Sequence, residues 1–546
     1  MKSKFYIHST HSKTLKNESS RNAVVVKEKI LIREDGKEDQ WIDHLNIIRD
    51  PIRPFWITTL PNRNHRFKKE FEEIRNLEMY QCHDSELSMK LSQALGMPAW
   101  QSFKSVKQLC SSPYVYGADI ETEVLIKQAY IDKQPTGLLP KLSKGAFDIE
   151  NEVRGDQRIN LITFIHEHQI YTAALKEYCK IYDRETDTFT PASHEDCLKV
   201  INDIIGSELT KHNFELNFSI HESELELIKW IFDRIHECKT DFIGVWNINH
   251  DLPHIIDRIL ALGGNVTKIM AHPDVPPQYQ MATYKEDVTK TQHFTDKWHW
   301  MSITGYSQFV DSMCLYARLR KVYGRDSSYK LDDIANKELG QGKLHFGEIT
   351  NHWQEQNYNF LPYIAYNIND VLIMMLMEWK NNDIGALTGL CGLSLPVQFR
   401  SQTTMVRNDF YHYAKPKGKL PSAVGSEMYN PWDGLFPKAG GTVLPPDKAT
   451  GVGIKALKGI NKTTQVSVAT NDYDMSSMYP SCLEAFNISK ETQLFASIKI
   501  NGHSIAGLEM FFSDITRPDI NAVNICNNFY GLPNYKDILE EFNKDF

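Results

Sequence analysis

The sequence lacks long hydrophobic runs, a signal-peptide core and paired cysteines. No stretch of its 546 residues reaches the roughly 18 consecutive apolar residues of a membrane span, and VLIMMLM (371–377) predicts only the core of a short helix. The N-terminal segment MKSKFYIHSTHSKTLKNESS has no apolar core, so we expect the chain to stay in the cytoplasm. Nine cysteines without a CxxC pair disfavour both a zinc ribbon and a disulfide framework.

The chain also lacks an excess of positive charge. Its net charge of −8 argues against a protein that coats nucleic acid indiscriminately, although an enzyme with local basic patches is still allowed. The length predicts about three or four domains. The Pro- and Gly-rich segments KQPTGLLPKLSKG (133–145) and PKGKLPSAVGSEMYNPWDG (416–434) mark candidate boundaries between them.

Strand-like and helix-like segments alternate along the chain, which predicts α/β domains. GAFDIE and INLITFI are apolar strands separated by the polar turn NEVRGDQR, so they predict a hairpin. Helical apolar spacing in ESELELIKWIFDRIHE (222–237) leads into the strand DFIGVW (241–246).

Two carboxylates stand on one strand in the segment FDIENE. Because side chains alternate along a strand, Asp148 and Glu150 share one face and form a hard-oxygen pair suited to Mg²⁺ or Mn²⁺. The segment ADIETE repeats the pattern at Asp119 and Glu121. We favour the first pair because it ends an apolar strand and is followed directly by a hairpin partner.

A third carboxylate lies in WNINHDLPHIIDRI. The strand DFIGVW ends at Asn247, and a turn then brings Asp251 to the start of a helix. A helix N-terminus favours an anion, so the residues leave two alternatives open for Asp251, a metal ligand or a helix N-cap.

The fourth carboxylate lies in YNINDVLIMMLME. Tyr366 and Asp370 are one helical turn apart and share a face, while Val371 to Met377 are expected to pack inward. A tyrosine hydroxyl beside a metal-binding carboxylate can orient an attacking water.

Together, these motifs resemble the 3′→5′ proofreading exonuclease domain of family B DNA polymerases, most closely those of T-even-like tailed phages. VDSMCLYARLRKVYGRDSSYKLDDIANKELGQGKL (310–344) is similar to the segment between that family's second and third exonuclease motifs. One position departs from the pattern: His250 stands where the family has Phe or Tyr before the aspartate.

The resemblance implies a ribonuclease H-like fold and a two-metal site that binds Mg²⁺ or Mn²⁺. Asp148, Glu150 and Asp370 would hold one ion, and Asp148 with Asp251 would contact the second. Tyr366 would align the water, and Asn247 is expected to contact the substrate.

A further segment, YDMSSMYPS, resembles the first palm motif of the same family, DxxSLYPS. By that resemblance, Asp474 would be a Mg²⁺ ligand for nucleotide addition, and Tyr479 would stack beneath the incoming sugar and exclude a ribose 2′-OH. KAGGTVLPP is similar to a loop that meets DNA, in which Gly440 and Gly441 would allow close backbone approach.

The second carboxylate motif of a palm and the lysine of a fingers helix are missing from the sequence. We therefore expect a split polymerase, completed by a second subunit that carries the fingers, the remaining palm and the thumb; a fragment of one longer chain is the alternative. The expected parts are an α+β N-terminal domain (1–138), the exonuclease domain (139–384), a return segment (385–430) and a partial palm (431–546).

The expected partners are a DNA primer-template with a single-stranded 3′ end, dNTP in the completed enzyme, the second subunit and, through it, a sliding clamp. No membrane is expected, and the location would be the cytoplasm of a phage-infected bacterium. Two other functions stay open, a stand-alone 3′→5′ exonuclease and a catalytically silent DNA-binding scaffold.

Overall fold

The computed structural model describes most of the chain up to residue 425, and the described residues belong to one compact unit, Met1–Met428. The described ranges are 2–12, 22–33, 39–65, 68–69, 71–97, 104–135, 138–289, 293–344, 352–390 and 402–425. Asp474, Tyr479, Gly440, Gly441 and the expected partial palm (431–546) lie outside them.

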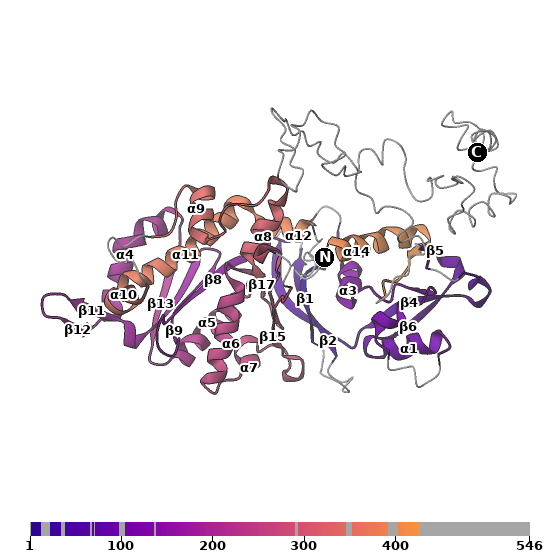
Figure 1. Ribbon diagram of the computed structural model, residues 1–546, viewed down its shortest axis with the longest axis horizontal. Helices are drawn as coiled ribbons and strands as arrows, with labels where there is room; N and C mark the ends of the chain where they lie inside the picture. The colour runs from indigo at the N-terminus through magenta and orange to yellow at the C-terminus, as the bar shows by residue number, and fades with distance from the viewer. Residues whose placement is uncertain are drawn as a thin grey trace, which may run out of the picture. The chain divides into compact units, whose positions relative to one another are not determined.

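The central element is a six-stranded sheet in the order β13-β10-β9-β8-β14-β17 (Figure 1). Its strands are β8 (Lys144–Asn151), β9 (Ile159–His166), β10 (Gln169–Leu175), β13 (Glu215–His221), β14 (Phe242–Val245) and β17 (Gln308–Asp311). β9 runs antiparallel to both of its neighbours, whereas the other adjacent pairs are parallel. The predicted hairpin of GAFDIE and INLITFI is confirmed as β8 and β9.

Helices cover both faces of this sheet (Figure 1). One face packs against α4 (His194–Lys211), α9 (Leu331–Leu339) and α11 (Phe360–Asn381), and the other against α5 (Glu224–Cys238), α6 (Ile248–Ala261) and α7 (Val266–Met270). Within β8, Ala146 faces the α11 side, whereas Phe147 and Ile149 belong to the core on the α5 and α6 side. Strand alternation therefore places Asp148 and Glu150 under α11.

The helix α11 is the one described helix whose length and composition would allow it to cross a membrane, yet 94% of its most apolar window is buried inside the protein. Val371–Met377 are all buried, so the predicted inward packing of this segment is confirmed. The hydrophobicity of α11 is explained by its contact with the sheet, α4 and α9.

Two small sheets form the N-terminal part, β1-β2-β3 and β6-β4-β7. Their strands are β1 (Lys2–Ser12), β2 (Ala23–Ile32), β3 (Gln40–Arg49), β4 (Ile52–Thr58), β6 (Leu77–His83) and β7 (Val115–Tyr116), and the helices beside them are α1 (Leu87–Ala94), α2 (Val106–Leu109) and α3 (Thr122–Ile131). Much later in the chain, β18 (Lys419–Pro421) pairs with β5 (Phe71–Glu73). The chain therefore returns to its N-terminal part after α14 (Gln402–Ala414).

The remaining strands and α-helices of the described part form two antiparallel strand pairs and three helices, and short 3-10 turns link several elements. The strand pairs and helices are β11 (Lys180–Asp183) with β12 (Thr188–Pro191), β15 (Ala282–Lys285) with β16 (Trp300–Ile303), α8 (Ser312–Leu319), α10 (His352–Tyr358) and α12 (Asp383–Leu390).

One buried carboxylate anchors the starts of the two central strands. Asp241, immediately before β14, accepts a 2.7 Å hydrogen bond from the backbone N–H of Ser143, immediately before β8. It also pairs with Lys27 at 2.5 Å and Lys29 at 2.6 Å, both from β2. Although burial opposes the change, the two lysines lower the pKa of Asp241. This network fixes the register of β8 and β14 upstream of the candidate site residues.

Candidate metal centre

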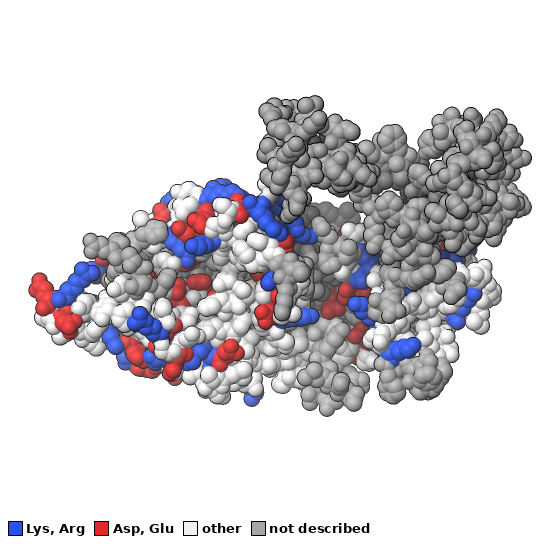
Figure 2. Space-filling model, viewed as in Figure 1, with Lys and Arg blue, Asp and Glu red and all other residues white. Residues whose placement is uncertain are grey.

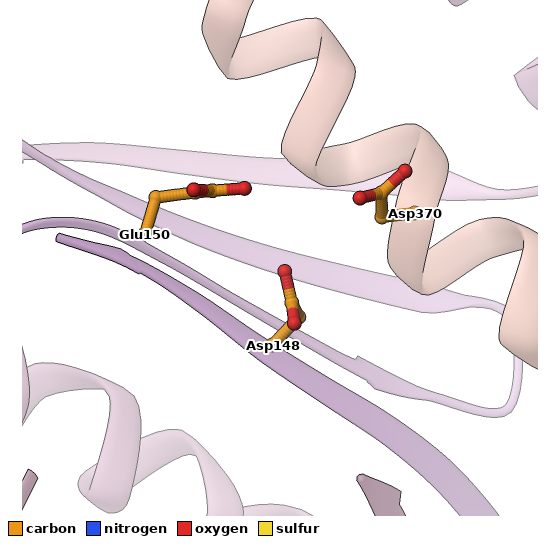
Figure 3. Close-up of side chains that lie close together, drawn as sticks. All are labelled: Asp148, Glu150 and Asp370. Carbon is orange, nitrogen blue, oxygen red and sulfur yellow. The ribbon is translucent and has the colours of Figure 1, made fainter. Parts of the chain in front are cut away.

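Three of the four predicted carboxylates meet between β8 and α11. Oxygens of Asp148, Glu150 and Asp370 all lie within 4.8 Å of one another, and Figure 3 shows the three side chains pointing toward a common space. We call these three residues the acidic cluster. Among the residues that the structure describes, no other group of three His, Cys, Asp or Glu side chains has metal-ligand spacing.

Helix α11 also holds the two carboxylates of β8 in position. The side-chain amide of Asn367 donates a 2.8 Å hydrogen bond to Asp148 Oδ2, and the Tyr363 hydroxyl donates to Glu150 Oε2. Both donors lie on the face of α11 that carries Asp370, because their spacing follows the helical repeat. Each carboxylate of β8 therefore has one oxygen fixed by a neutral donor.

On α11 itself, Asp370 is 2% exposed and pairs through Oδ2 with the ammonium of Lys343. The same ammonium donates a 3.0 Å hydrogen bond to the Tyr366 hydroxyl. Asp370 Oδ1 is buried and has no hydrogen-bond partner within the described part of the chain. Asp370 therefore has one oxygen in an ion pair and one buried oxygen without a hydrogen-bond partner among the described residues.

Asp251 is buried and close enough for its charge to act on Asp148, but it is not one of the three members of the acidic cluster. It lies in the first turn of α6, which begins at Ile248 and thus starts earlier than we expected. The N-cap position belongs to Asn247, so the cap alternative for Asp251 is wrong. The side chain of Asn247 is exposed and makes no cap hydrogen bond; its carbonyl accepts from the Asp251 N–H at 3.2 Å.

Crowding of carboxylates in a buried space shifts their protonation. Burial raises the pKa of Asp148 well above its usual range, and the charges of the other three carboxylates add to the rise. Burial likewise raises the pKa of Glu150 and of Asp370 to about 7 each, although hydrogen bonds and the Lys343 charge oppose it. The pKa of Asp251 is also raised by burial. Such a group of acids is stabilised by a cation.

The residues present fit a divalent metal ion. Carboxylate oxygens are the ligands that Mg²⁺ and Mn²⁺ prefer. Two of them, Asp370 Oδ1 and Asp251 Oδ2, are buried without a hydrogen-bond partner among the residues described. A buried acceptor left unpaired is costly, and a bound cation would remove that cost.

The second DxE pair has a different environment. Glu121 pairs with the guanidinium of Arg407 at 3.0 Å, and Asp119 accepts a 3.0 Å hydrogen bond from the Val424 N–H. Arg407 also lies 3.5 Å from Asp119. An arginine therefore satisfies this pair, which ties α14 to the N-terminal part.

Sequence reasoning missed Lys343, Tyr363 and Asn367. Tyr363 and Asn367 could have been found, because both recur with Asp370 on one face of a helix. Lys343 carries no such signal: it stands 27 residues before Asp370, in a stretch after α9 without regular structure.

Fold and site together define a mixed α/β protein with a buried acidic centre suited to a hard cation. No protein-family model matches the chain. The chain is 24% identical over 275 residues to the DNA-directed DNA polymerase of Escherichia phage RB69, a match that covers 50% of this chain and 26% of that polymerase. The chain is thus a distant relative of a phage DNA polymerase and matches only about a quarter of that polymerase's length.

The charged surface agrees with the balanced composition. Figure 2 shows Lys and Arg interspersed with Asp and Glu on the face in view, over the part built on the six-stranded sheet. Contact with nucleic acid would therefore depend on local groups of charges rather than on a uniformly basic surface.

Proposed function

We propose that this chain is the N-terminal part of a family B DNA polymerase and acts as a metal-dependent 3′→5′ proofreading exonuclease. The observation that carries the proposal is the convergence of Asp148, Glu150 and Asp370 within 4.8 Å. Asp251 is buried beside them, and the distant relative is a phage DNA polymerase.

The sheet topology supports a ribonuclease H-like exonuclease domain. The order β10-β9-β8-β14-β17, with β9 alone antiparallel, is the arrangement expected of that fold with β13 added at one edge. The first strand, β8, carries two of the acids, and the helix that follows the last strands of the domain carries another.

Each residue of the site has a distinct role in this proposal. Asp148, Glu150 and Asp370 would hold one Mg²⁺ or Mn²⁺ ion, and Asp148 with Asp251 the other. Bound ions would neutralise charge on the phosphate and make water a usable nucleophile near neutral pH.

Neighbouring side chains of the chain keep these groups in place. Tyr363 and Asn367 fix the carboxylates of β8, so the acids are preorganised before substrate arrives. The Tyr366 hydroxyl, held at 3.0 Å by Lys343, would orient the attacking water. Lys343 itself offsets part of the negative charge at Asp370.

The polymerase half of the proposal concerns residues outside the described part of the chain. Asp474 would bind Mg²⁺, Tyr479 would contact the incoming sugar, and Gly440 and Gly441 would approach DNA. We propose that a second subunit supplies the fingers, remaining palm and thumb, with dNTP and a sliding clamp engaged by the assembled enzyme. The assembled enzyme would act on primer-template DNA in the cytoplasm of an infected bacterium.

The test uses a 5′-labelled, mismatched primer on a template, with Mg²⁺ and nucleotides. We expect stepwise shortening by the purified chain, and Asp148→Ala should lower its rate by at least about 10²-fold, the scale of losing one strong transition-state contact. Shortening that persists in Asp148→Ala would refute the exonuclease assignment. Template-directed extension by the chain alone would refute the need for a second subunit.

A further inference from the structure

The residue that departs from the family pattern contacts the fourth acid directly. His250 Nδ1 lies 3.0 Å from Asp251 Oδ1, so the imidazole N–H donates to that oxygen. The aspartate is 3% exposed, whereas about half of the His250 side chain is exposed. A phenylalanine at this place could pack there but could donate no hydrogen bond, and the hydroxyl of a tyrosine lies at the far end of its ring from the position of Nδ1.

His250 is in turn supported by a second histidine of the same helix. The rings of His250 and His254 are stacked, with centroids 5.8 Å apart and planes 11° apart. His254 Nε2 donates a 2.8 Å hydrogen bond to the backbone carbonyl of Gln157, in the turn between β8 and β9. The orientation of the first imidazole is therefore tied to the hairpin that carries Asp148 and Glu150.

The two oxygens of Asp251 are left in different states. Oδ1 is held by the imidazole, and Oδ2 is buried without a hydrogen-bond partner among the described residues. A carboxylate with one oxygen fixed cannot rotate freely, so its other oxygen has a defined direction. Donors that orient a ligand in this way commonly change metal affinity about 10–100-fold when they are removed.

From this arrangement we propose that His250 is a positioning residue, which fixes Asp251 through Oδ1 so that Oδ2 can bind the second divalent ion. The inference rests on the proposed two-metal site and adds a role for a residue of this particular chain. Packing alone does not explain the contact, because the imidazole approaches through its polar Nδ1 edge.

The experiment measures binding of Mn²⁺ alone to the full chain by titration calorimetry and by electron paramagnetic resonance of free Mn²⁺. We expect two ions per wild-type chain. His250→Phe keeps a ring but removes the hydrogen-bond donor. The affinity for the ion held by Asp148 and Asp251 should therefore fall roughly 10–100-fold, while the other ion is retained. The melting temperature of the metal-free protein should stay close to that of the wild type.

A conservative variant separates donation from simple packing. In His250→Asn the amide nitrogen occupies the position of Nδ1, so Mn²⁺ binding should return toward the wild-type affinity. His194→Phe is the matched control, because His194 lies on α4 and donates to the carbonyl of Phe218 in β13, so its replacement should leave both ions bound.

Each other result overturns the inference. Wild-type affinity for both ions in His250→Phe, or no recovery in His250→Asn, would remove the role of His250 and leave the acidic cluster intact. Failure of the wild type to bind Mn²⁺, or binding that survives in Asp148→Asn, would instead remove the metal site itself and the proposed function with it.

Discussion

Lys343 and Asp370 form an ion pair at the acidic cluster, between a carboxylate that is 2% exposed and a lysine side chain that is 25% exposed. Although burial opposes it, the Asp370 charge raises the pKa of the Lys343 ammonium. The lysine is therefore charged at every pH at which the site would operate. It supplies the positive charge that the four neighbouring carboxylates need when no metal is bound.

Replacing this lysine should destabilise the metal-free protein more than the protein with Mg²⁺ bound. In Lys343→Met the buried carboxylate loses its partner, and we expect the free energy of unfolding in EDTA to fall by roughly 2 kcal/mol. Mg²⁺ should recover much of that loss, since a divalent ion supplies the missing charge. Chemical denaturation with EDTA and with Mg²⁺ measures both values.

Lys343→Arg is the control because it keeps the positive charge and should lose less stability. An equal loss for Lys343→Met with and without Mg²⁺ would contradict a role for Lys343 in balancing the charge of the cluster.

The two DxE pairs offer a matched comparison within one chain. Glu150→Gln removes one carboxylate of the acidic cluster and should slow excision about 10²-fold. Glu121→Gln makes the same chemical change beside Arg407 and should leave excision unchanged. Single-turnover excision of a labelled single strand compares the two variants, and a similar loss in both would contradict the assignment of the site to β8.

Stability should depend on pH in a direction set by the raised pKa values. Burial raises the pKa of Glu150 and of Asp370 to about 7, so the folded state holds protons that the unfolded state has released. Their contribution is fully present below the unfolded pKa values, near 4, and is lost as the pH rises through about 7. The metal-free protein should therefore become less stable from about pH 5 to about pH 8.

Mg²⁺ should reverse this trend, because it favours the ionised carboxylates. The rise in melting temperature on adding Mg²⁺ should be larger at about pH 8 than at about pH 5. Asp370→Asn should reduce the difference. An Mg²⁺ effect that is equal at both pH values would show that these carboxylates do not bind the ion.

The sequence was sufficient where local patterns determine structure. Alternation on FDIENE placed Asp148 and Glu150 on one face, and the apolar run after Asp370 marked a buried helix; both features are present in β8 and α11. Helical periodicity also predicted α5 correctly.

Contacts between distant segments could not be predicted in this way. One local boundary also differed: the helix carrying Asp251 begins at Ile248, so the turn after β14 is shorter than we expected. The pairing of Lys343 with Asp370 depends on how the chain after α9 crosses α11, and no local pattern reports that path. Asp119 and Glu121 look like a site in sequence until the fold brings Arg407 beside them.

Tyr363 offers a test of how strongly the cluster depends on its hydrogen-bond partners. Its hydroxyl donates to Glu150, and its ring stacks on that of Tyr366 with centroids 5.6 Å apart and planes 5° apart. Tyr363→Phe removes only the hydroxyl, so it should slow excision roughly tenfold, the lower range for loss of a group that orients a ligand. Tyr363→Leu also removes the ring that supports Tyr366, so its loss should be larger.

Comparing the two variants separates orientation of the acid from support of the tyrosine. Both should be assayed by single-turnover excision, and their melting temperatures should be recorded so that unfolding is not mistaken for lost chemistry. Equal rates in Tyr363→Phe and the wild type would mean that Glu150 keeps its position without this donor. Equal rates in Tyr363→Phe and Tyr363→Leu would mean that the ring stack contributes nothing, since the hydroxyl would then account for the whole effect.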